Sequence, residues 1–338
     1  MMRAYIVPHG CTSIDELRRV ERPDLEPRAG QVLVRIRAAS LNRRDQAVAS
    51  GTYFGRPVAR DTIPLSDGAG EVIAVGEGVT RHSLGDLVVA TFFQTPVDGP
   101  PFRERASLGS PLDGTLAEQM LLYEDGLIPI PDGLSFEEAA CLPCAGVTAW
   151  NALMGAGTPV KAGDTVLVLG SGGVSTFALQ FAKAAGARVI ATSSSDEKLE
   201  RVKALGASAG VNYTRTPDWH KEVLKLTGGR GVDCVVEVGG VGTLERSFDS
   251  LAHGGKVALI GVLTGRSANL NPNALMWKEG SLHGIKVGST GTFEQLNRAI
   301  EANRIRPIID KVFPFDDAIA AYHHQASGNF VGKIVISV

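Results

Sequence analysis

The chain has 338 residues, of which 44% are apolar and 21% are charged, and its formal net charge is −2. This composition fits two folded domains of ordinary size, and the small net charge argues against nucleic acid or an anionic membrane surface as the main partner. No apolar run approaches the ~18 residues of a membrane span, and the N-terminus lacks the apolar core of a signal peptide, so we expect a cytoplasmic protein.

Short β-rich runs separated by glycine turns fill the first part of the chain, to about residue 125. Val32, Val34 and Ile36 lie on one face of an expected strand, and the run 71–75 ends at a glycine turn. This rhythm predicts a small β-barrel-like domain. The stretch Thr91–Gly114 is irregular and rich in Pro and Gly, which indicates a functional loop.

The four cysteines are too few for a disulfide framework in a chain of this length, which agrees with a reducing compartment. Cys141 and Cys144 have the spacing of a CxxC motif. They lie in an apolar, helical stretch that lacks the preceding strand of a thioredoxin-like site. Buried packing is therefore favoured over redox catalysis.

From about residue 149 strands alternate with helices, which predicts a doubly wound parallel sheet of the Rossmann type. We expect its six strands at 165–169, 188–192, 209–212, 232–238, 256–261 and 281–287. In the tail we expect helices at 293–303 and 316–326, and a last strand at 333–338 that returns to the first domain. The predicted domains are 149–282 for dinucleotide binding, and 1–148 with 283–338 for the remainder.

The stretch Val166–Ser175 combines a β-branched strand, a glycine turn and the start of a helix. Gly170 allows the tight turn, Gly172 allows close approach of a pyrophosphate, and the helix N-terminus near Gly173 favours the phosphates. The third glycine of the fingerprint is replaced by Ser175, which affects packing rather than phosphate access. The alternative is an ordinary glycine-rich turn. The expected cofactor contacts here are Gly170, Ser171, Gly172, Gly173 and Val174.

The end of the second Rossmann strand bears on the choice of cofactor. The carboxylate that binds the ribose of NAD is expected there, and the chain has three serines instead, 193–195. Ser193 and Ser194 hydroxyls can donate to a 2′-phosphate, and the Lys198 ammonium can pair with it. Asp196 more naturally begins the next helix. The sequence thus favours NADPH, with NADH possible if Lys198 is only a solvated helix residue.

These landmarks, in this order, resemble the medium-chain dehydrogenase/reductase superfamily over essentially the whole chain. The resemblance is carried by Gly68–Val72, Gly85-Asp86, Cys144–Trp150, Gly170–Ser175 and Val236–Gly240. It implies an α/β protein with a GroES-like β-barrel catalytic domain and a Rossmann doubly wound six-stranded parallel sheet. It also implies a homodimer that pairs through the edge strand near residues 281–285, because an unpaired edge is a liability.

Zinc alcohol dehydrogenases of this superfamily bind catalytic zinc through two Cys and one His. This chain has Asn42, Ser66 and Cys144 at those positions, and one thiolate does not make a zinc site. No zinc is therefore expected, although an unusual site of Asp45, Asp67 and Cys144 remains an alternative. The loop that carries a structural zinc in relatives has no Cys. Asn42 and Asp45 instead match the Asn-x-x-Asp motif of the zinc-independent, quinone-oxidoreductase-like branch.

The resemblance assigns further roles. It places Tyr213 and Lys333 near the adenosine ribose. Asn42 and Tyr53 are candidates to orient the acceptor oxygen; the alternatives are a helix cap for Asn42 and a surface aromatic for Tyr53. Asn42 is also an expected cofactor contact. The resemblance surrounds the nicotinamide with Thr148, which we count as catalytic, and with Val238, Gly239, Gly261, Val262, Leu263, Gly284 and Ile285.

Together these features predict an NADPH-dependent reductase of quinones or α,β-unsaturated carbonyls. Without zinc to polarise an alcohol, alcohol oxidation is disfavoured, whereas a conjugated electrophile accepts hydride and then a proton. Phe92, Phe93, Trp277 and the loop to Gly114 are expected to line a pocket for a bulky apolar acceptor. The alternatives are an alcohol dehydrogenase or aldehyde reductase of the same superfamily, and a non-catalytic NADPH-binding protein.

Overall fold

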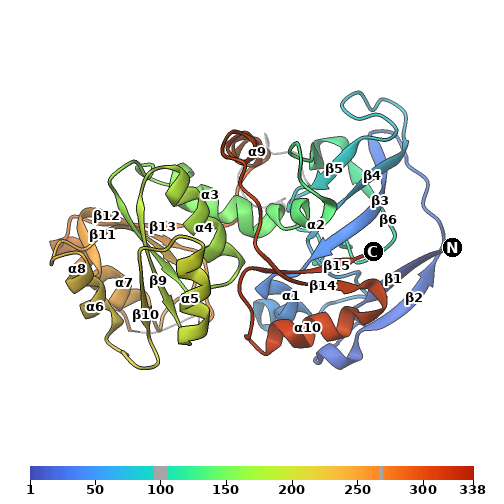
Figure 1. Ribbon diagram of the computed structural model, residues 1–338. Coiled ribbons are helices and arrows are strands. Elements are labelled where there is room, and N and C mark those ends of the chain that lie inside the picture. Colours follow the sequence, from blue (N-terminus) through green and yellow to red (C-terminus); the bar gives the residue numbers. More distant parts are fainter. Residues whose placement is uncertain (95–105, 266–268) are drawn as a thin grey trace. The chain divides into compact units, whose positions relative to one another are not determined.

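The computed structural model describes residues 1–94, 106–265 and 269–338 (Figure 1). The chain divides into two compact units. The first contains Met1–Cys144, Ser289–Asn329 and Lys333–Val338, and the second contains Ala145–Gly288 and Phe330–Gly332. Within the described residues, no helix has both the length and the apolar character needed to cross a membrane.

The first unit is built on a seven-stranded sheet in the order β14-β15-β3-β4-β5-β7, with β6 paired to β3; β1 and β2 form a separate antiparallel pair. β15 runs antiparallel to β3, so the last strand returns to the first unit, as the sequence predicts. The strands are β1 Met2–Ile6, β2 Arg18–Arg22, β3 Gln31–Ser40, β4 Asp67–Val75, β5 Leu87–Ala90, β6 Gln119–Tyr123, β7 Leu127–Pro129, β14 Ile309–Pro314 and β15 Lys333–Ser337.

The core of this unit lies on β3 and its neighbours. Val32, Val34 and Ile36 of β3 pack with Val72 of β4 and Val88 of β5 in one buried cluster. These β-branched side chains suit a pleated, half-buried surface, which is why the alternation on β3 was informative. The result is the GroES-like domain that the resemblance implies.

The helices of the first unit are mostly short. The two tail helices lie close to where the sequence predicts them. The α-helices are α1 Arg43–Ala49, α2 Phe136–Ala139, α9 Thr290–Asn303 and α10 Ala318–Ala326, with 3₁₀ turns at Ile14–Glu16, Tyr53–Gly55, Glu124–Gly126 and Phe315–Asp317.

The second unit is a Rossmann sheet of six parallel strands in the order β10-β9-β8-β11-β12-β13. This confirms the predicted doubly wound sheet, and each strand overlaps its predicted range. The strands are β8 Thr165–Leu169, β9 Arg188–Ser193, β10 Ala209–Asn212, β11 Val232–Glu237, β12 Leu251–Leu259 and β13 Ser281–Gly284.

Helices cover both faces of this sheet. α4 and α5 lie on one face, and α6, α7 and α8 lie on the other (Figure 1). Every residue of β8 is buried, as expected for a central parallel strand. The helices are α3 Val147–Trp150, α4 Gly173–Ala184, α5 Asp196–Ala204, α6 Trp219–Leu226, α7 Leu244–Asp249 and α8 Asn273–Trp277, with π-helical turns at Leu142–Gly146 and Asn151–Gly155.

Candidate active site

Three strand ends bring a polar cluster together in the first unit. Ser40, at the end of β3, lies opposite both Asp67 of β4 and Val335 of β15. This register places the residues just after β3 beside the first residues of β4 and β15. The Lys333 ammonium, whose residue is 3% exposed, donates to Leu41 O and to Asn42 Oδ1, each at 2.7 Å. Its Nζ lies 3.8 Å from Asp67 Oδ2.

The Asp67 carboxylate is fully buried and held on both oxygens. Ser66 Oγ donates to its Oδ1 at 2.7 Å, and the backbone N of Cys144 donates to its Oδ2 at 3.1 Å. Asn42 Nδ2 lies 3.5 Å from Ser66 Oγ. Lys333, Asn42, Ser66 and Asp67 therefore form a closed ring of polar groups, which we call the Lys333 ring.

Asn42 and Asp45 lie at the start of α1. The backbone N of Asn42 donates to Asp45 Oδ2 at 2.7 Å, whereas the Asn42 amide contacts Lys333 and Ser66. The Asn42 side chain thus has a role beyond a cap. Burial raises the pKa of Asp45 to about 6, although the Arg44 guanidinium opposes this rise. Asp45 Oδ1 has no hydrogen-bond partner.

Arg44 is a member of the site that the sequence did not single out. Its guanidinium carbon Cζ lies 4.9 Å from the centroid of the Tyr53 ring and 5.0 Å from the centroid of the Phe92 ring. It also donates to Leu108 O at 2.7 Å and, through Nε, to Tyr53 OH at 3.4 Å. Because Tyr53 accepts from Arg44, its own O–H remains a donor. Tyr53 is half-buried in this contact rather than an isolated surface aromatic.

The positions of the family's zinc ligands carry a different set of groups here. The Asn42 amide is hydrogen-bonded to the Lys333 ammonium, and the Ser66 hydroxyl is hydrogen-bonded to the Asp67 carboxylate. Burial, followed by the nearby Asp67, raises the pKa of the Cys144 thiol, which disfavours a thiolate. Among the described residues, no three His, Cys, Asp or Glu side chains form a group able to hold a metal ion. This donor set does not fit catalytic zinc, which takes about three Cys, His or carboxylate ligands.

The CxxC pair has a structural environment. Cys141 is fully buried, and its Sγ donates to Glu137 O at 3.2 Å. Burial raises the pKa of Cys141 to about 12, so its thiol is protonated at neutral pH. Neither cysteine is in a disulfide. The contacts fit the predicted packing role, because redox-active cysteines need thiolate character and access.

In the second unit, the glycine turn after β8 is shaped to receive phosphates. Gly170 has φ +75°, and a Cβ built at Gly170 or Gly172 would meet no protein atom within 4 Å. Gly172 is the N-cap of the twelve-residue helix α4 and makes no side-chain cap. The Ser175 hydroxyl donates to Leu169 O at 2.6 Å, so the residue at the third glycine position ties the helix to β8. The turn fits a dinucleotide pyrophosphate.

The end of β9 has the polar groups expected for an adenosine ribose. Ser193 is buried, its carbonyl accepts from the backbone N of Tyr213 at 3.0 Å, and Ser195 caps α5. Asp196 begins α5, as predicted, and its carboxylate contacts Arg215 at 2.5 Å. Arg215, 74% exposed in its side chain, is a cation at this edge that the sequence analysis missed.

Lys333, expected near the adenosine ribose, makes its hydrogen bonds within the first unit. Lys333 lies in the first unit, and its ammonium hydrogen bonds go to Leu41 and Asn42. The physical reason is the pairing of β15 with β3, which carries the first residue of β15 into the polar cluster. Tyr213, in contrast, is 41% exposed in the second unit beside the β9 end.

A buried carboxylate organises the loop after β11. Glu237 is fully buried and accepts from the backbone N of Gly239 at 2.7 Å and of Gly240 at 3.0 Å. The hydroxyls of Thr243 and Ser247 also donate to it. This anchor was missed in the sequence, although a lone Glu in an apolar strand was a signal that it needs partners.

The remaining predicted nicotinamide contacts are distributed over the second unit. Gly261 packs closely on the β11 loop, since a Cβ there would lie 1.9 Å from Val238 O. Thr148 is buried in α3. Val262 and Leu263 are 56% and 53% exposed, and Gly284 and Ile285 lie at the end of β13.

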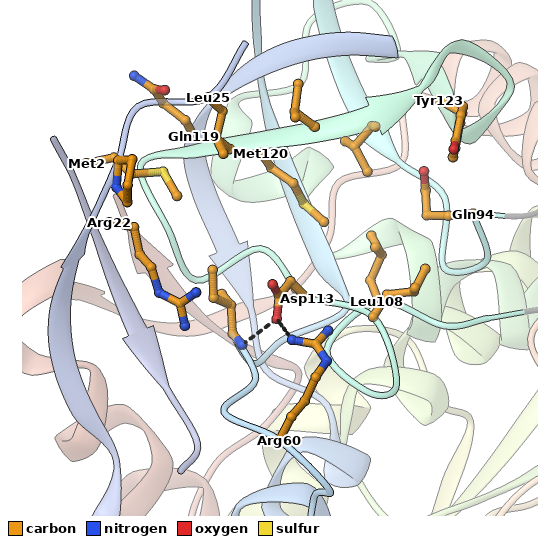
Figure 2. Close-up of a pocket in the computed structure, with 16 residues that line it drawn as sticks. Met2, Arg22, Leu25, Arg60, Gln94, Leu108, Asp113, Gln119, Met120 and Tyr123 are labelled. Carbon is orange, nitrogen blue, oxygen red and sulfur yellow. Dashed lines mark hydrogen bonds and ion pairs between the residues drawn. The ribbon is translucent and has the colours of Figure 1, made fainter. Parts of the chain in front are cut away.

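Figure 2 shows a pocket of about 510 Å³ in the first unit, with apolar walls and an Arg60–Asp113 ion pair at 3.0 Å. Five residues of the predicted functional loop line it, namely Gln94, Leu108, Leu112, Asp113 and Gly114, whereas Asn42, Tyr53 and Thr148 do not. Of the expected acceptor contacts, Phe92 and Phe93 are buried, and Trp277 of α8 is 72% exposed. Part of the predicted functional loop, residues 95–105, lies outside the described residues.

Comparisons with known proteins identify the family of the chain. A model of the alcohol dehydrogenase GroES-like domain matches residues 28–132, and a model of the zinc-binding dehydrogenase domain matches residues 173–302. A zinc-type alcohol dehydrogenase-like protein of Schizosaccharomyces pombe is 44% identical over the full length of both chains. A quinone oxidoreductase of Sus scrofa is 31% identical over 92% of this chain and 90% of its own.

Similar solved structures come from the same group of proteins. A putative alcohol dehydrogenase from Sinorhizobium meliloti 1021 is 39% identical, with a TM-score of 0.91 over 100% of this chain and 98% of its own. A mycobacterial protein solved in complex with NADPH is 29% identical, with a TM-score of 0.83 over 100% of both chains. The chain therefore belongs to the medium-chain dehydrogenase/reductase superfamily of oxidoreductases.

Proposed function

We propose that the chain is an NADPH-dependent oxidoreductase that transfers hydride to a quinone or an α,β-unsaturated carbonyl without zinc. One observation carries the proposal: at the position of the first zinc ligand, Asn42 accepts a hydrogen bond from the Lys333 ammonium at 2.7 Å. An amide engaged in this way is a poor ligand for zinc. Homology to a quinone oxidoreductase supports this branch of the superfamily.

The acceptor class follows from the groups that are present. Bound NADPH supplies hydride, and reduction of a conjugated carbonyl then needs a proton for the negative charge left on the acceptor. The Tyr53 O–H is a donor because the Arg44 Nε–H already occupies the phenol oxygen as acceptor. Asn42 Nδ2 is the second donor. Both groups suit an acceptor carbonyl oxygen, and Thr148 is our third candidate contact.

NADPH is favoured over NADH by the groups at the end of β9. Ser193 and Ser194 stand where a ribose carboxylate would repel a 2′-phosphate, and Lys198 and Arg215 supply positive charge in that region. Asp196 is negative and pairs with Arg215, so the three side chains together leave one net positive charge in that region. The mycobacterial relative was solved with NADPH, which supports the same choice.

The cofactor choice gives a direct prediction. Replacing Lys198 and Arg215 together with Ala removes two cations and is expected to raise the Kd for NADPH about 10-fold or more. The Kd for NADH should change by less than about twofold, because NADH lacks the 2′-phosphate. Fluorescence titration measures both constants. Lys203→Ala, an exposed lysine on the same helix α5, is the matched control; equal losses for both cofactors would refute the assignment.

A second prediction concerns the glycine turn. Gly172 has φ −77°, and a Cβ there meets no protein atom, so Gly172→Ala should change the free energy of unfolding by no more than about 1 kcal/mol. The added methyl group stands where the pyrophosphate must approach, so cofactor Kd should rise at least about 10-fold. Urea unfolding and fluorescence titration measure the two effects. Gly291→Ala in α9 is the control; it should leave the cofactor Kd unchanged and raise the free energy of unfolding by no more than about 1 kcal/mol.

The function is tested by following NADPH oxidation on metal-stripped protein with quinones, enones, aldehydes and alcohols as partners. Turnover of quinones or enones without metal is the expected result, and Tyr53→Phe should lower kcat by about 10-fold or more. Activity that appears only after Zn²⁺ is added, or only with alcohols or aldehydes, would contradict the proposal. Tight NADPH binding with no turnover of any acceptor would favour a binding protein instead.

We also propose that the protein acts in the cytoplasm as a homodimer. Strand β13 is an edge of the Rossmann sheet, and Leu282 on it is 41% exposed. Edge strands of this kind are normally covered, and a second copy would cover this one. Sedimentation equilibrium of wild type and of Leu282→Lys tests the dimer, and a wild type that sediments as a monomer would exclude it.

A further inference from the structure

The Lys333 ring gives the buried ammonium a role that the reaction needs. We propose that Lys333 is a positioning residue, whose hydrogen bond to Asn42 Oδ1 fixes the orientation of the carboxamide so that one Nδ2–H group is left as a donor to the acceptor oxygen. This inference rests on the proposed function, in which Asn42 orients the acceptor. Lys333 itself acts through Asn42.

The first step is the orientation of the Asn42 amide. An ammonium has donors only, so the atom that lies 2.7 Å from Lys333 Nζ must be the amide oxygen. The opposite orientation would place an NH₂ group against the ammonium and leave a buried donor without an acceptor. Lys333 thereby decides which end of the Asn42 amide is the donor end.

The second step comes from the other side of the ring. The Ser66 hydroxyl donates a hydrogen bond to Asp67 Oδ1 at 2.7 Å. Its oxygen can therefore only accept from Asn42. Asn42 Nδ2 lies 3.5 Å from it and is the donor. Ser66 takes one of the two N–H groups. The second N–H is the one that we assign to the acceptor oxygen.

The third step is that the ammonium is itself fixed in place. Lys333 also donates to Leu41 O at 2.7 Å, and Asp67 balances its charge from 3.8 Å. Asp67 is in turn held by Ser66 and by the backbone of Cys144. The shorter contacts of Lys333 go to Leu41 and Asn42 rather than to Asp67, which favours a role toward Asn42 over a simple ion pair.

Asn42→Asp is the variant that separates positioning from structure. An aspartate has nearly the same shape and still accepts from Lys333, and circular dichroism shows whether the variant is folded. It lacks both N–H groups, so kcat for the quinone or enone should fall about 10- to 100-fold. Full kcat in a folded Asn42→Asp protein would overturn the assignment of Asn42 as a donor, and with it the proposal.

A double-mutant cycle tests whether Lys333 acts through Asn42. Lys333→Met and Asn42→Ala should each lower kcat/KM about 10-fold, and the double variant should be no worse than about the poorer single variant. Losses that multiply would show that the two residues act independently, which would overturn the proposal. Lys311→Met is the control, because Lys311 is exposed on β14, the strand paired with β15.

A spectroscopic arm does not depend on turnover. In protein labelled with ¹⁵N-asparagine, the Asn42 side-chain NH₂ signals are those that disappear in Asn42→Asp. They should shift in Lys333→Met and stay in place in Lys311→Met. Unchanged signals in Lys333→Met would refute the contact. If wild type reduces no acceptor, the proposed function fails, and this arm still decides whether Lys333 sets the orientation of Asn42.

Discussion

Glu237→Ala is expected to lower the free energy of unfolding by about 3–5 kcal/mol, the largest effect of any single change considered for this protein. The carboxylate is fully buried and accepts from two backbone N–H groups, of Gly239 and Gly240. It also accepts from the hydroxyls of Thr243 and Ser247. Its removal leaves the N–H groups of Gly239 and Gly240 and the hydroxyl of Ser247 without this acceptor, whereas the Thr243 hydroxyl can still donate to Gly240 O at 3.1 Å. Urea unfolding followed by circular dichroism measures the loss.

Two comparisons show whether the effect comes from these donors. Glu237→Gln keeps one acceptor oxygen and should lose clearly less stability than Glu237→Ala. Glu294→Ala, an exposed glutamate in α9, should change the free energy of unfolding by less than about 0.5 kcal/mol. A Glu237→Ala protein as stable as the Glu294 variant would show that water satisfies the loop and that the carboxylate is not its anchor.

Asp45 is expected to make stability depend on pH between about 4 and 7. Its pKa is raised from 3.8 to about 6 in the folded protein, chiefly by burial. The folded state therefore binds the proton more tightly than the unfolded state. The stabilisation is complete below about pH 4 and is lost as the pH rises through about 6. Two pKa units correspond to about 3 kcal/mol.

The measurement is the difference in unfolding free energy between wild type and Asp45→Asn, taken by urea unfolding from about pH 4 to about pH 8. Asparagine does not titrate, so the pH dependence of this difference belongs to Asp45 and its immediate neighbours. Wild type should gain up to about 3 kcal/mol on the variant as the pH falls. The exposed Asp132→Asn should show no such trend. A gain in the opposite direction would mean that Arg44 dominates over burial.

The Rossmann unit was readable from the sequence because its signals are local. Strands β8, β9 and β11 are short runs rich in β-branched residues, and β8 with its glycine turn at Gly170 is the clearest case. Ser175 shows the limit of such a pattern. A fingerprint search treats it as a missing glycine, whereas the structure shows a hydrogen bond to Leu169 that a glycine cannot make.

The Lys333 ring was beyond the sequence because its members come from distant strands. Lys333 and Asn42 are separated by 291 positions, and only the register of β15 on β3 brings them together. Arg44 was hidden for a different reason. A charged residue at the start of a short helix usually faces solvent, and its stacking on Tyr53 and Phe92 depends on two other segments of the chain.

The loops that follow β11 and β12 pack against each other, and this contact limits which of their residues can be substituted. A Cβ at Gly261 would lie 1.9 Å from Val238 O, and one at Gly240 would lie 2.9 Å from Gly261 O. The two loops are thus fitted to each other backbone to backbone, and a library that randomises these glycines will yield mostly misfolded clones. Val262 and Leu263 are more than half exposed, so substitutions there are expected to disturb the fold less and to act on the expected nicotinamide contacts.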